Sequence, residues 1–262
     1  MCGICGFKSN MEEGKGKVLL RKMGARILHR GPDDWGEWYS KDIYLGMTRL
    51  EIIDLKTGMQ PMISKEHSIT VVFNGEIYNY HQLWKDLIKS GLEFKTNHSD
   101  TEVILNGYIK WGVEIFHRLN GMFSVALWDG KNNKLILARD KMGIKPLYYH
   151  IKGNQLFFAS EPKSLLQDPI INFQINDKKL PFYFQSRSPG IGETLFKDIH
   201  SLEAGTYAVF KHDTFKIKRY TSYFFKKHLN RNKNSFDIEE LESIFKDTIK
   251  MEMVSDVPVG TF

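Results

Sequence analysis

The sequence has few cysteines and no long apolar run. Two of its 262 residues are cysteine, Cys2 and Cys5, and two thiols three positions apart cannot cross-link a small secreted domain. A zinc site needs four ligands, and the sequence has no second cysteine pair. No apolar stretch reaches the length of a membrane helix, which needs about 18 consecutive apolar residues. Residues 11–15 are too polar for the apolar core of a signal peptide. We therefore expect a cytoplasmic protein with reduced thiols, no metal and no membrane association.

Excess charge is confined to one segment. The chain carries a net charge of +6, yet residues 211–234 contain eight Lys or Arg and one acid, Asp213. The rest of the chain has 29 basic and 30 acidic residues. A local basic run of this kind is more typical of a solvated linker than of a phosphate-binding surface, and no nucleic-acid-reading motif is present. We expect no nucleic-acid partner.

Apolar spacing predicts helices at residues 17–28 and 80–90 and from residue 99 to about 111. Ser99 and Glu102 fit a capping box at the start of the third helix, and Asp100 lies in its first turn, where the helix dipole favours an ionised carboxylate. A β-type run over 68–73 is expected to end at Asn74-Gly75, a pair that is most often a hairpin turn when it stands alone.

From residue 121 onward, strands dominate the pattern. Residues 122–128 and 134–139 flank Asp129-Gly130, a hairpin signal, and further β-type runs follow. Successive strand-to-strand steps predict mainly antiparallel sheets with helices on their faces, an α+β fold. We divide the chain into a domain over residues 1–225, a basic linker over 226–235, and a last unit over 236–262 whose apolar helical stripe indicates the beginning of a second domain.

Cys2 directly follows the initiator methionine. Removal of Met1 would leave a residue with a thiol and a free α-amine. A thiol has a pKa of about 8.5 and an α-amine a pKa of about 8. Because the two values are similar, the amine can accept the proton of the thiol nucleophile. Taken alone, a cysteine at position 2 is more often an ordinary residue of a frayed terminus.

Several polar motifs follow Cys2 at the ends of predicted elements, where sites are usually built. They are Cys2-Gly3-Ile4-Cys5-Gly6, His29-Arg30-Gly31-Pro32-Asp33, Arg49-Leu50-Glu51-Ile52, Gln60-Pro61-Met62, Asn74-Gly75-Glu76-Ile77-Tyr78-Asn79 and Ser99-Asp100-Thr101-Glu102. Later segments, including Gly143-Ile144-Lys145-Pro146-Leu147 and Ser255-Asp256-Val257-Pro258, continue the series. In order and spacing the whole chain resembles the class II (N-terminal nucleophile) glutamine amidotransferase domain of asparagine synthetases.

The resemblance implies a four-layer αββα sandwich of the N-terminal nucleophile hydrolase type and hydrolysis of glutamine to glutamate and ammonia through a Cys2 thioester. By the same resemblance, Asn74 and the Gly75 backbone form an oxyanion hole. Arg49 binds the α-carboxylate of L-glutamine, Glu76 and Asp100 bind its ammonium group, and Ile52 offers backbone contacts. Arg30-Gly31-Pro32-Asp33 is interpreted as shaping the pocket wall, with a purely structural turn as the alternative, and Cys5 as a small buried residue of the first strand. Glu51, together with Met47 and Thr48, departs from the usual family pattern at the rim.

The resemblance also implies a synthetase domain in cis, which would lie beyond the last residue of this sequence and would hold ATP and magnesium. The glutaminase itself needs no cofactor. We expect the ammonia to supply an ATP-dependent asparagine synthesis. The alternatives are an amidotransferase for another acceptor (a sugar, peptide or other carboxylate), a poorly active glutamine-binding regulatory module, and a structural partner that supplies only an interface. A homodimer stays open.

Overall fold

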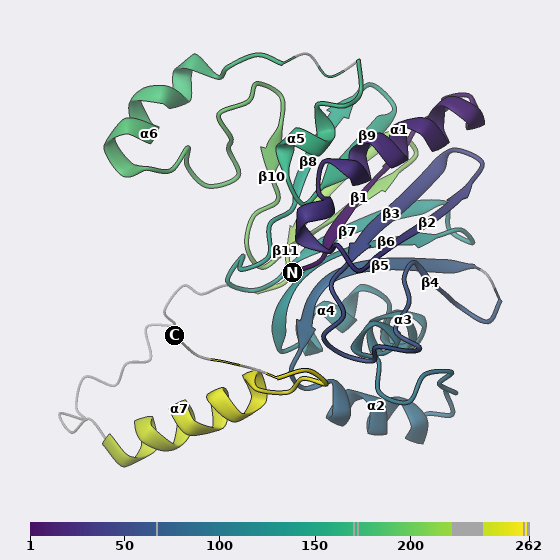
Figure 1. The fold of residues 1–262 in the computed structure, drawn as a ribbon, viewed down its shortest axis with the longest axis vertical. Coiled ribbons are helices and arrows are strands. Elements are labelled where there is room, and N and C mark those ends of the chain that lie inside the picture. The colour runs from purple at the N-terminus through teal and green to yellow at the C-terminus, as the bar shows by residue number, and fades with distance from the viewer. Residues whose placement is uncertain (67, 170, 172, 222–237, 259, 261–262) are drawn as a thin grey trace.

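A computed structural model describes residues 1–66, 68–169, 171, 173–221, 238–258 and 260. In this part of the chain the strands form two six-stranded sheets whose paired neighbours run antiparallel (Figure 1). In spatial order the first sheet contains β10 (His200–Ser201), β8 (Tyr148–Lys152), β9 (Gln155–Ala159), β1 (Gly3–Lys8), β3 (Ile43–Arg49) and β2 (Asp34–Ser40). The second contains β12 (Thr214–Arg219), β11 (Thr206–Lys211), β7 (Lys134–Arg139), β6 (Gly121–Asp129), β5 (Ile69–Ile77) and β4 (Met62–Ile63).

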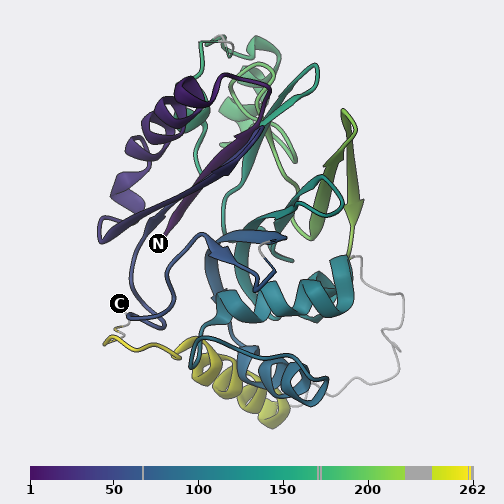
Figure 2. The same ribbon diagram turned by 90° about the vertical axis from the view of Figure 1, so that its right-hand side faces the viewer.

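The two sheets pack face to face, and helices cover both outer faces (Figure 2). Ile4 of β1 and Leu45 of β3 share one buried cluster with Val72 of β5 and Leu137 of β7. A second cluster lies between the first sheet and the helices α1 (Glu13–Ala25) and α5 (Pro162–Leu165). A third lies between the second sheet and α2 (Tyr80–Lys89), α3 (Asp100–Trp111) and α4 (Ile115–Arg118). The predicted α+β class and the αββα sandwich are confirmed.

Every residue of β1 and of β3 is buried. Each of these strands has the other sheet on one side and a helix layer on the other, so both of its faces are apolar. Such strands lack the alternation of apolar and polar residues that marks a strand with one face in water. The same burial makes the ends of these central strands the places where polar side chains can reach a shared cavity.

The structure modifies two predictions about the helices. The first helix runs over Glu13–Ala25 and is followed by a 3₁₀ turn, Leu28–Arg30, instead of continuing to residue 28. The helix after Ser99 has the predicted extent, but the capping box is not formed, because the Ser99 side chain makes no cap. The Glu102 carboxylate instead accepts hydrogen bonds of 2.8 Å from the backbone N–H groups of Lys95 and Thr96.

The prediction that a strand ends at Asn74-Gly75 is wrong. β5 passes through both residues to Ile77, paired with β6 along its whole length. Gly75 has φ +156°, and a Cβ at this position would lie 2.0 Å from the Met122 backbone oxygen. Only glycine allows the two strands to approach so closely, and a local pair Asn-Gly cannot reveal that approach.

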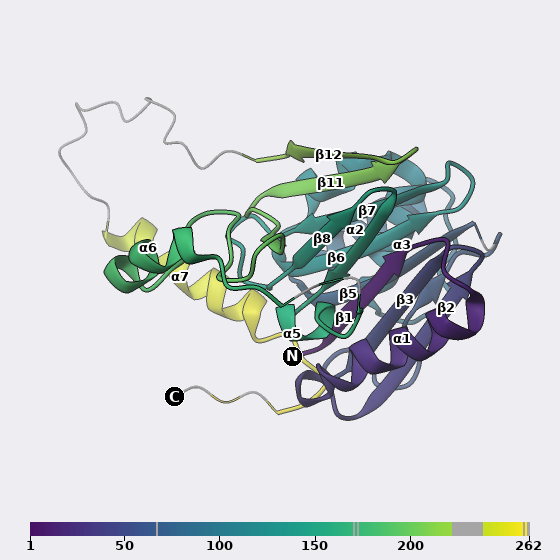
Figure 3. The same ribbon diagram turned by 90° about the horizontal axis from the view of Figure 1, so that it is seen from above.

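The last unit contains α7 (Ile238–Glu252), followed by residues 253–258. The predicted apolar stripe is exposed, with Phe245 65% and Ile238 71% accessible. The short helix α6 (Leu180–Ser186) also lies away from the two sheets (Figure 3). The predicted linker 226–235 lies outside the described residues. None of the described helices is both long and apolar enough to cross a bilayer.

Candidate active site

Cys2 lies immediately before β1, at the edge of the space between the two sheets. Side chains alternate along a strand, so Cys2 packs on the same side as Ile4, between the sheets, whereas Cys5 belongs to the core under α1. The Cys2 Sγ lies 3.3 Å from the backbone nitrogen of Leu50 and 3.5 Å from its oxygen. The interpretation of Cys5 as a buried strand residue is confirmed, since none of its surface is exposed.

The backbone around Cys2 is anchored by side chains from distant segments. Arg30 Nε donates a 3.0 Å hydrogen bond to the Cys2 carbonyl, and Arg30 Nη1 pairs with Glu161 at 3.1 Å. The backbone N–H of Ile4 donates to Ser160 Oγ at 2.9 Å. The terminus is therefore fixed rather than frayed. None of the residues of the turn Arg30-Gly31-Pro32-Asp33 lines the pocket, so this turn acts on the site through the Cys2 backbone that Arg30 holds and not as part of the pocket wall.

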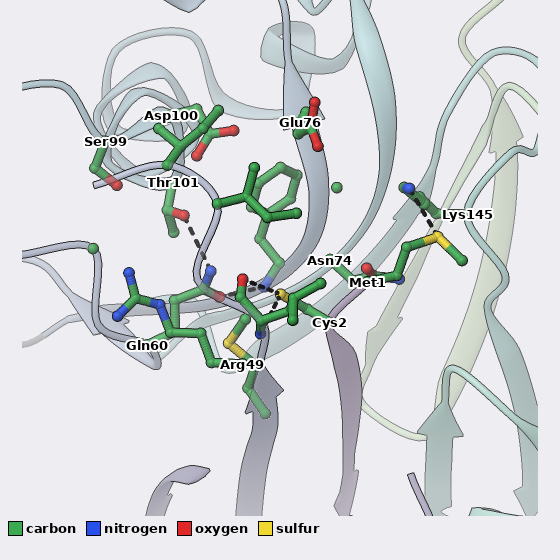
Figure 4. Close-up of a pocket in the computed structure, with 17 residues that line it drawn as sticks. Met1, Cys2, Arg49, Gln60, Asn74, Glu76, Ser99, Asp100, Thr101 and Lys145 are labelled. Carbon is green, nitrogen blue, oxygen red and sulfur yellow. Dashed lines mark hydrogen bonds between the residues drawn. The ribbon is translucent and has the colours of Figure 1, made fainter. Parts of the chain in front are cut away.

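One pocket brings together all of the residues that were predicted to be catalytic or to bind the substrate (Figure 4). The predicted residues that line it are Cys2, Arg49, Ile52, Asn74, Gly75, Glu76 and Asp100. In Figure 4, Cys2 lies between Arg49 and Asp100 on one side and Lys145 on the other. The elements that carry these residues are far apart in sequence, and only the stacking of the two sheets makes them neighbours.

Arg49 places a positive charge on one wall of the pocket. It is the last residue of β3, and 5% of its surface is exposed. Its guanidinium donates to the carbonyl oxygens of Asp54 and Leu55 at 2.7 and 3.3 Å and pairs with the Glu51 carboxylate at 3.0 Å. The loop after β3 therefore wraps around the guanidinium and fixes it. A rigid guanidinium of this kind is well suited to a carboxylate ligand, which it can bind with two parallel hydrogen bonds.

Two carboxylates, those of Asp100 and Glu76, line the same pocket. Asp100 begins α3, and its Oδ2 accepts a 3.1 Å hydrogen bond from the Ile77 backbone N–H. Burial, together with the neighbouring charge of Glu76, raises the pKa of Asp100 to about 7. Burial also raises the pKa of Glu76. The helix dipole was expected to favour the ionised form of Asp100, but loss of water outweighs that preference and the hydrogen bonds that the carboxylate accepts. A cationic ligand would restore the charge.

Asn74 and Gly75 present amide groups between the thiol and the carboxylates. Asn74 is almost wholly buried, its Nδ2 lies 3.5 Å from Ser124 Oγ, and its Oδ1 has no hydrogen-bond partner among the described residues. A buried amide with unused hydrogen-bonding capacity is costly unless something binds to it. Oδ1 can only accept a hydrogen bond, whereas Nδ2 carries two N–H groups, and its single contact with Ser124 leaves one of them to donate to a ligand.

The Cys2 thiol is a poor nucleophile without a base. Burial raises its pKa, and the nearby charge of Arg49 and the hydrogen bond with Leu50 offset only part of this effect. Burial lowers the pKa of the N-terminal amine, which belongs to Met1 here, and the charges of Arg30 and Lys145 lower it further. The lowered pKa increases the fraction of amine that is unprotonated at neutral pH and can accept the proton of the thiol.

Gln60 and Lys145 also line the pocket, although neither was predicted to be a site residue. Gln60 connects its walls, since its Nε2 donates to Thr101 Oγ1 at 3.1 Å and its Oε1 accepts from the Phe73 backbone at 2.7 Å. Lys145 is 4% exposed, and its ammonium lies 3.1 Å from the Met1 sulfur. Gln60 and Lys145 lie in the motifs that carried the resemblance, but nothing local to their sequence indicates that their side chains turn inward.

Among the described residues, no group of three or more His, Cys, Asp or Glu side chains is arranged to hold a metal ion. The polar groups of the pocket are instead two carboxylates, two cations, a thiol and amides. This set matches a small zwitterionic ligand, with opposite charges at one end and a polar group near the thiol.

Comparison with known families identifies the family to which the chain belongs. A family model described as a glutamine amidotransferase domain matches residues 1–221. The chain belongs to the glutamine amidotransferase domain family. Over its full length it is 37% identical to asparagine synthetase [glutamine-hydrolyzing] 3 of Bacillus subtilis and covers 43% of that protein. It is 36% identical to a putative asparagine synthetase of Methanocaldococcus jannaschii and covers 54% of it. The chain thus spans about half the length of these relatives.

Solved structures share the fold of this amidotransferase domain. The glutamine phosphoribosylpyrophosphate amidotransferase of B. subtilis superposes with a TM-score of 0.61 at 17% identity, over 84% of this chain and 49% of that protein. A likeness at this level of identity concerns the arrangement of sheets and helices.

Proposed function

We propose that this chain hydrolyses L-glutamine to glutamate and ammonia and that Cys2 is the nucleophile. One observation carries the proposal: the N-terminal thiol shares a pocket with a fixed guanidinium, two carboxylates and a buried amide whose nitrogen has an N–H left to donate. Glutamine has a carboxylate and an ammonium group at one end and a carboxamide at the other. The distribution of charge in the pocket matches these three groups.

Substrate binding follows from charge. Arg49 binds the α-carboxylate, and Asp100 and Glu76 bind the α-ammonium. The arriving ammonium lowers the pKa of both carboxyl groups because it stabilises their ionised forms. Ile52 lines the same wall as Arg49 and contributes backbone contacts. These interactions are made in the ground state, so they set the affinity for glutamine more than the rate of the chemical step.

The chemistry requires removal of Met1, so that the free α-amine belongs to Cys2. The amine takes the thiol proton while the sulfur attacks the carboxamide carbon. The resulting oxyanion is stabilised by the Asn74 amide and the Gly75 backbone N–H, each worth about 10²–10³ in rate. The intermediate collapses as the amine returns its proton to the departing nitrogen, which releases ammonia and leaves a thioester. Water then attacks the thioester, the amine accepts a proton from the water, and the thiol is regenerated as glutamate leaves.

We further propose that the ammonia is used by a synthetase domain in cis, in an ATP-dependent synthesis of asparagine. The names of the relatives and the half-length match to them support this assignment. ATP and magnesium would bind in that domain, and the glutaminase site would need neither. Another amide acceptor remains the alternative for the longer protein.

The test uses the purified chain, with intact mass to establish that Met1 is removed. Wild-type protein should release glutamate from glutamine, and Cys2→Ala should lose more than about 10³-fold of this activity. Cys5→Ala is the matched control, since it removes the other thiol, which faces the core under α1, away from the pocket. Equal glutamate release by wild type and Cys2→Ala would show that Cys2 is not the nucleophile. Glutamine binding without turnover would favour the regulatory alternative.

A further inference from the structure

The segment that follows α7 returns to the glutamine pocket. Val254 packs against the core cluster under the second sheet. Two residues later, the backbone N–H of Asp256 donates a 3.0 Å hydrogen bond to the carbonyl oxygen of Ile52, a residue that lines the pocket. In Figure 2 this yellow segment ends beside the blue loop that follows β3. A piece of chain about 200 residues away in sequence thus contacts the pocket wall directly.

The Asp256 carboxylate contacts two segments that lead into the pocket, the loop after β3 and the residues before α3. Its Oδ2 accepts a 2.8 Å hydrogen bond from the Asp54 backbone N–H and lies 2.7 Å from His98 Nε2. Asp54 belongs to the loop that holds Arg49, because its carbonyl oxygen accepts the 2.7 Å hydrogen bond from the guanidinium. His98 lies two residues before Asp100 in the sequence. One oxygen atom therefore connects the loop that holds Arg49 with the segment that leads into Asp100.

We propose that Asp256 is a positioning residue that fixes the separation between Arg49 and Asp100, and thereby the affinity for the two charged groups of glutamine. The inference rests on the proposed function, since it assigns the α-carboxylate to Arg49 and the α-ammonium to Asp100. Those two groups are attached to one carbon, so the ligand tolerates little change in the distance between its partners. Because Asp256 contacts both the loop around Arg49 and the segment before Asp100, it holds that distance before glutamine binds.

The contacts of Asp256 couple glutamine binding to the docking of residues 253–258 against the pocket. If the docked segment raises the affinity for glutamine, bound glutamine must stabilise the docked segment by the same factor. Glutamine should therefore slow hydrogen exchange at the Asp256 backbone amide, which donates to Ile52. A segment that serves only to complete the fold would show no such response to the ligand.

Steady-state kinetics of the full chain test the proposal. Asp256→Ala should raise the KM for glutamine about five- to tenfold and change kcat less than twofold, the size expected from losing charge-assisted hydrogen bonds at a partly exposed site. Asp256→Asn keeps an oxygen acceptor for the Asp54 N–H and should restore part of the affinity. Asp247→Ala is the matched control, because it removes a carboxylate from the exposed surface of α7 and should leave KM unchanged.

The contact between His98 and Asp256 predicts that substitutions of these two residues have non-additive effects on KM. His98→Ala should also raise KM, and the double variant with Asp256→Ala should be little worse than Asp256→Ala alone, since both changes break the same contact. An Asp256→Ala variant with a KM within twofold of wild type overturns the proposal, as do fully additive effects on KM and a kcat that falls as much as KM rises.

A separate measurement tests the positioning role of Asp256 independently of the proposed reaction. Calorimetric binding of glutamine to Cys2→Ala protein needs no turnover. If Cys2→Ala protein binds glutamine and the added Asp256→Ala change weakens binding five- to tenfold, the positioning role of Asp256 is supported even where wild type releases no glutamate. Unchanged binding refutes the positioning role alone, and absence of any glutamine binding refutes both proposals.

Discussion

Asp100→Asn should stabilise the protein without ligand and at the same time weaken glutamine binding. Asparagine keeps the size of the side chain and an oxygen that can accept the Ile77 N–H, but it carries no charge. In the folded protein burial raises the pKa of Asp100 from 3.8 to about 7. Between these two values the folded state holds a proton that the unfolded state has released. The stability of the wild type therefore falls as pH rises from about 4 to about 7, and the full cost is present above pH 7.

The size of the effect follows from the shift of about three pKa units. At about 1.4 kcal/mol per unit, ionised Asp100 costs the empty pocket up to about 4 kcal/mol at pH 8, and roughly 2.5 kcal/mol less at pH 5. Urea unfolding without glutamine should show Asp100→Asn to be more stable than wild type at pH 8, with an advantage that shrinks by this amount at pH 5. A variant that is less stable than wild type at pH 8, or a difference independent of pH, would refute the reasoning.

The same substitution should have the opposite effect on ligand binding. Glutamine should stabilise the wild type and should barely stabilise Asp100→Asn, because the ammonium loses a charged partner. The KM for glutamine should rise more than kcat falls, since the interaction exists in the ground state. In the wild type, KM should rise as pH falls below about 7, where Asp100 takes up its proton. A normal KM in Asp100→Asn would remove the carboxylate from the binding site.

Three further predictions concern other walls of the pocket. Gly75→Ala should destabilise the fold by about 3 kcal/mol or more in urea unfolding, since its Cβ would lie 2.0 Å from a β6 carbonyl oxygen, whereas Gly14→Ala, with nothing within 4 Å, should be neutral or stabilising. Arg49→Met should raise the KM for glutamine at least tenfold, about 1.4 kcal/mol or more, while Cys2 still reacts with iodoacetamide; an unchanged KM would exclude a carboxylate contact. Lys145→Met should move the acidic limb of the pH profile of kcat/KM to higher pH, because the charge of Lys145 lowers the pKa of the N-terminal amine. Lys141→Met, on the same loop, is the control and should leave this limb in place.

Local sequence patterns predicted elements whose signals are local. The helix after Ser99 and the β6–β7 hairpin have almost the predicted bounds, because apolar period and turn residues act within a few positions. The errors arose where a distant partner decided the outcome. β5 continues through Gly75 because β6 approaches it, and Glu102 caps the backbone at Lys95 and Thr96 instead of its own helix.

The sequence by itself determined which chemical groups are available: a thiol at position 2, a guanidinium at Arg49, an amide at Asn74 and carboxylates at Glu76 and Asp100, in an order that identifies the family. The tertiary structure alone decided what these groups become. Tertiary packing buries Asp100 and raises its pKa to about 7, and it brings Asp256 within 2.7 Å of His98, 158 residues away. Burial and contact distance depend on how the sheets pack, and no short stretch of sequence contains that information.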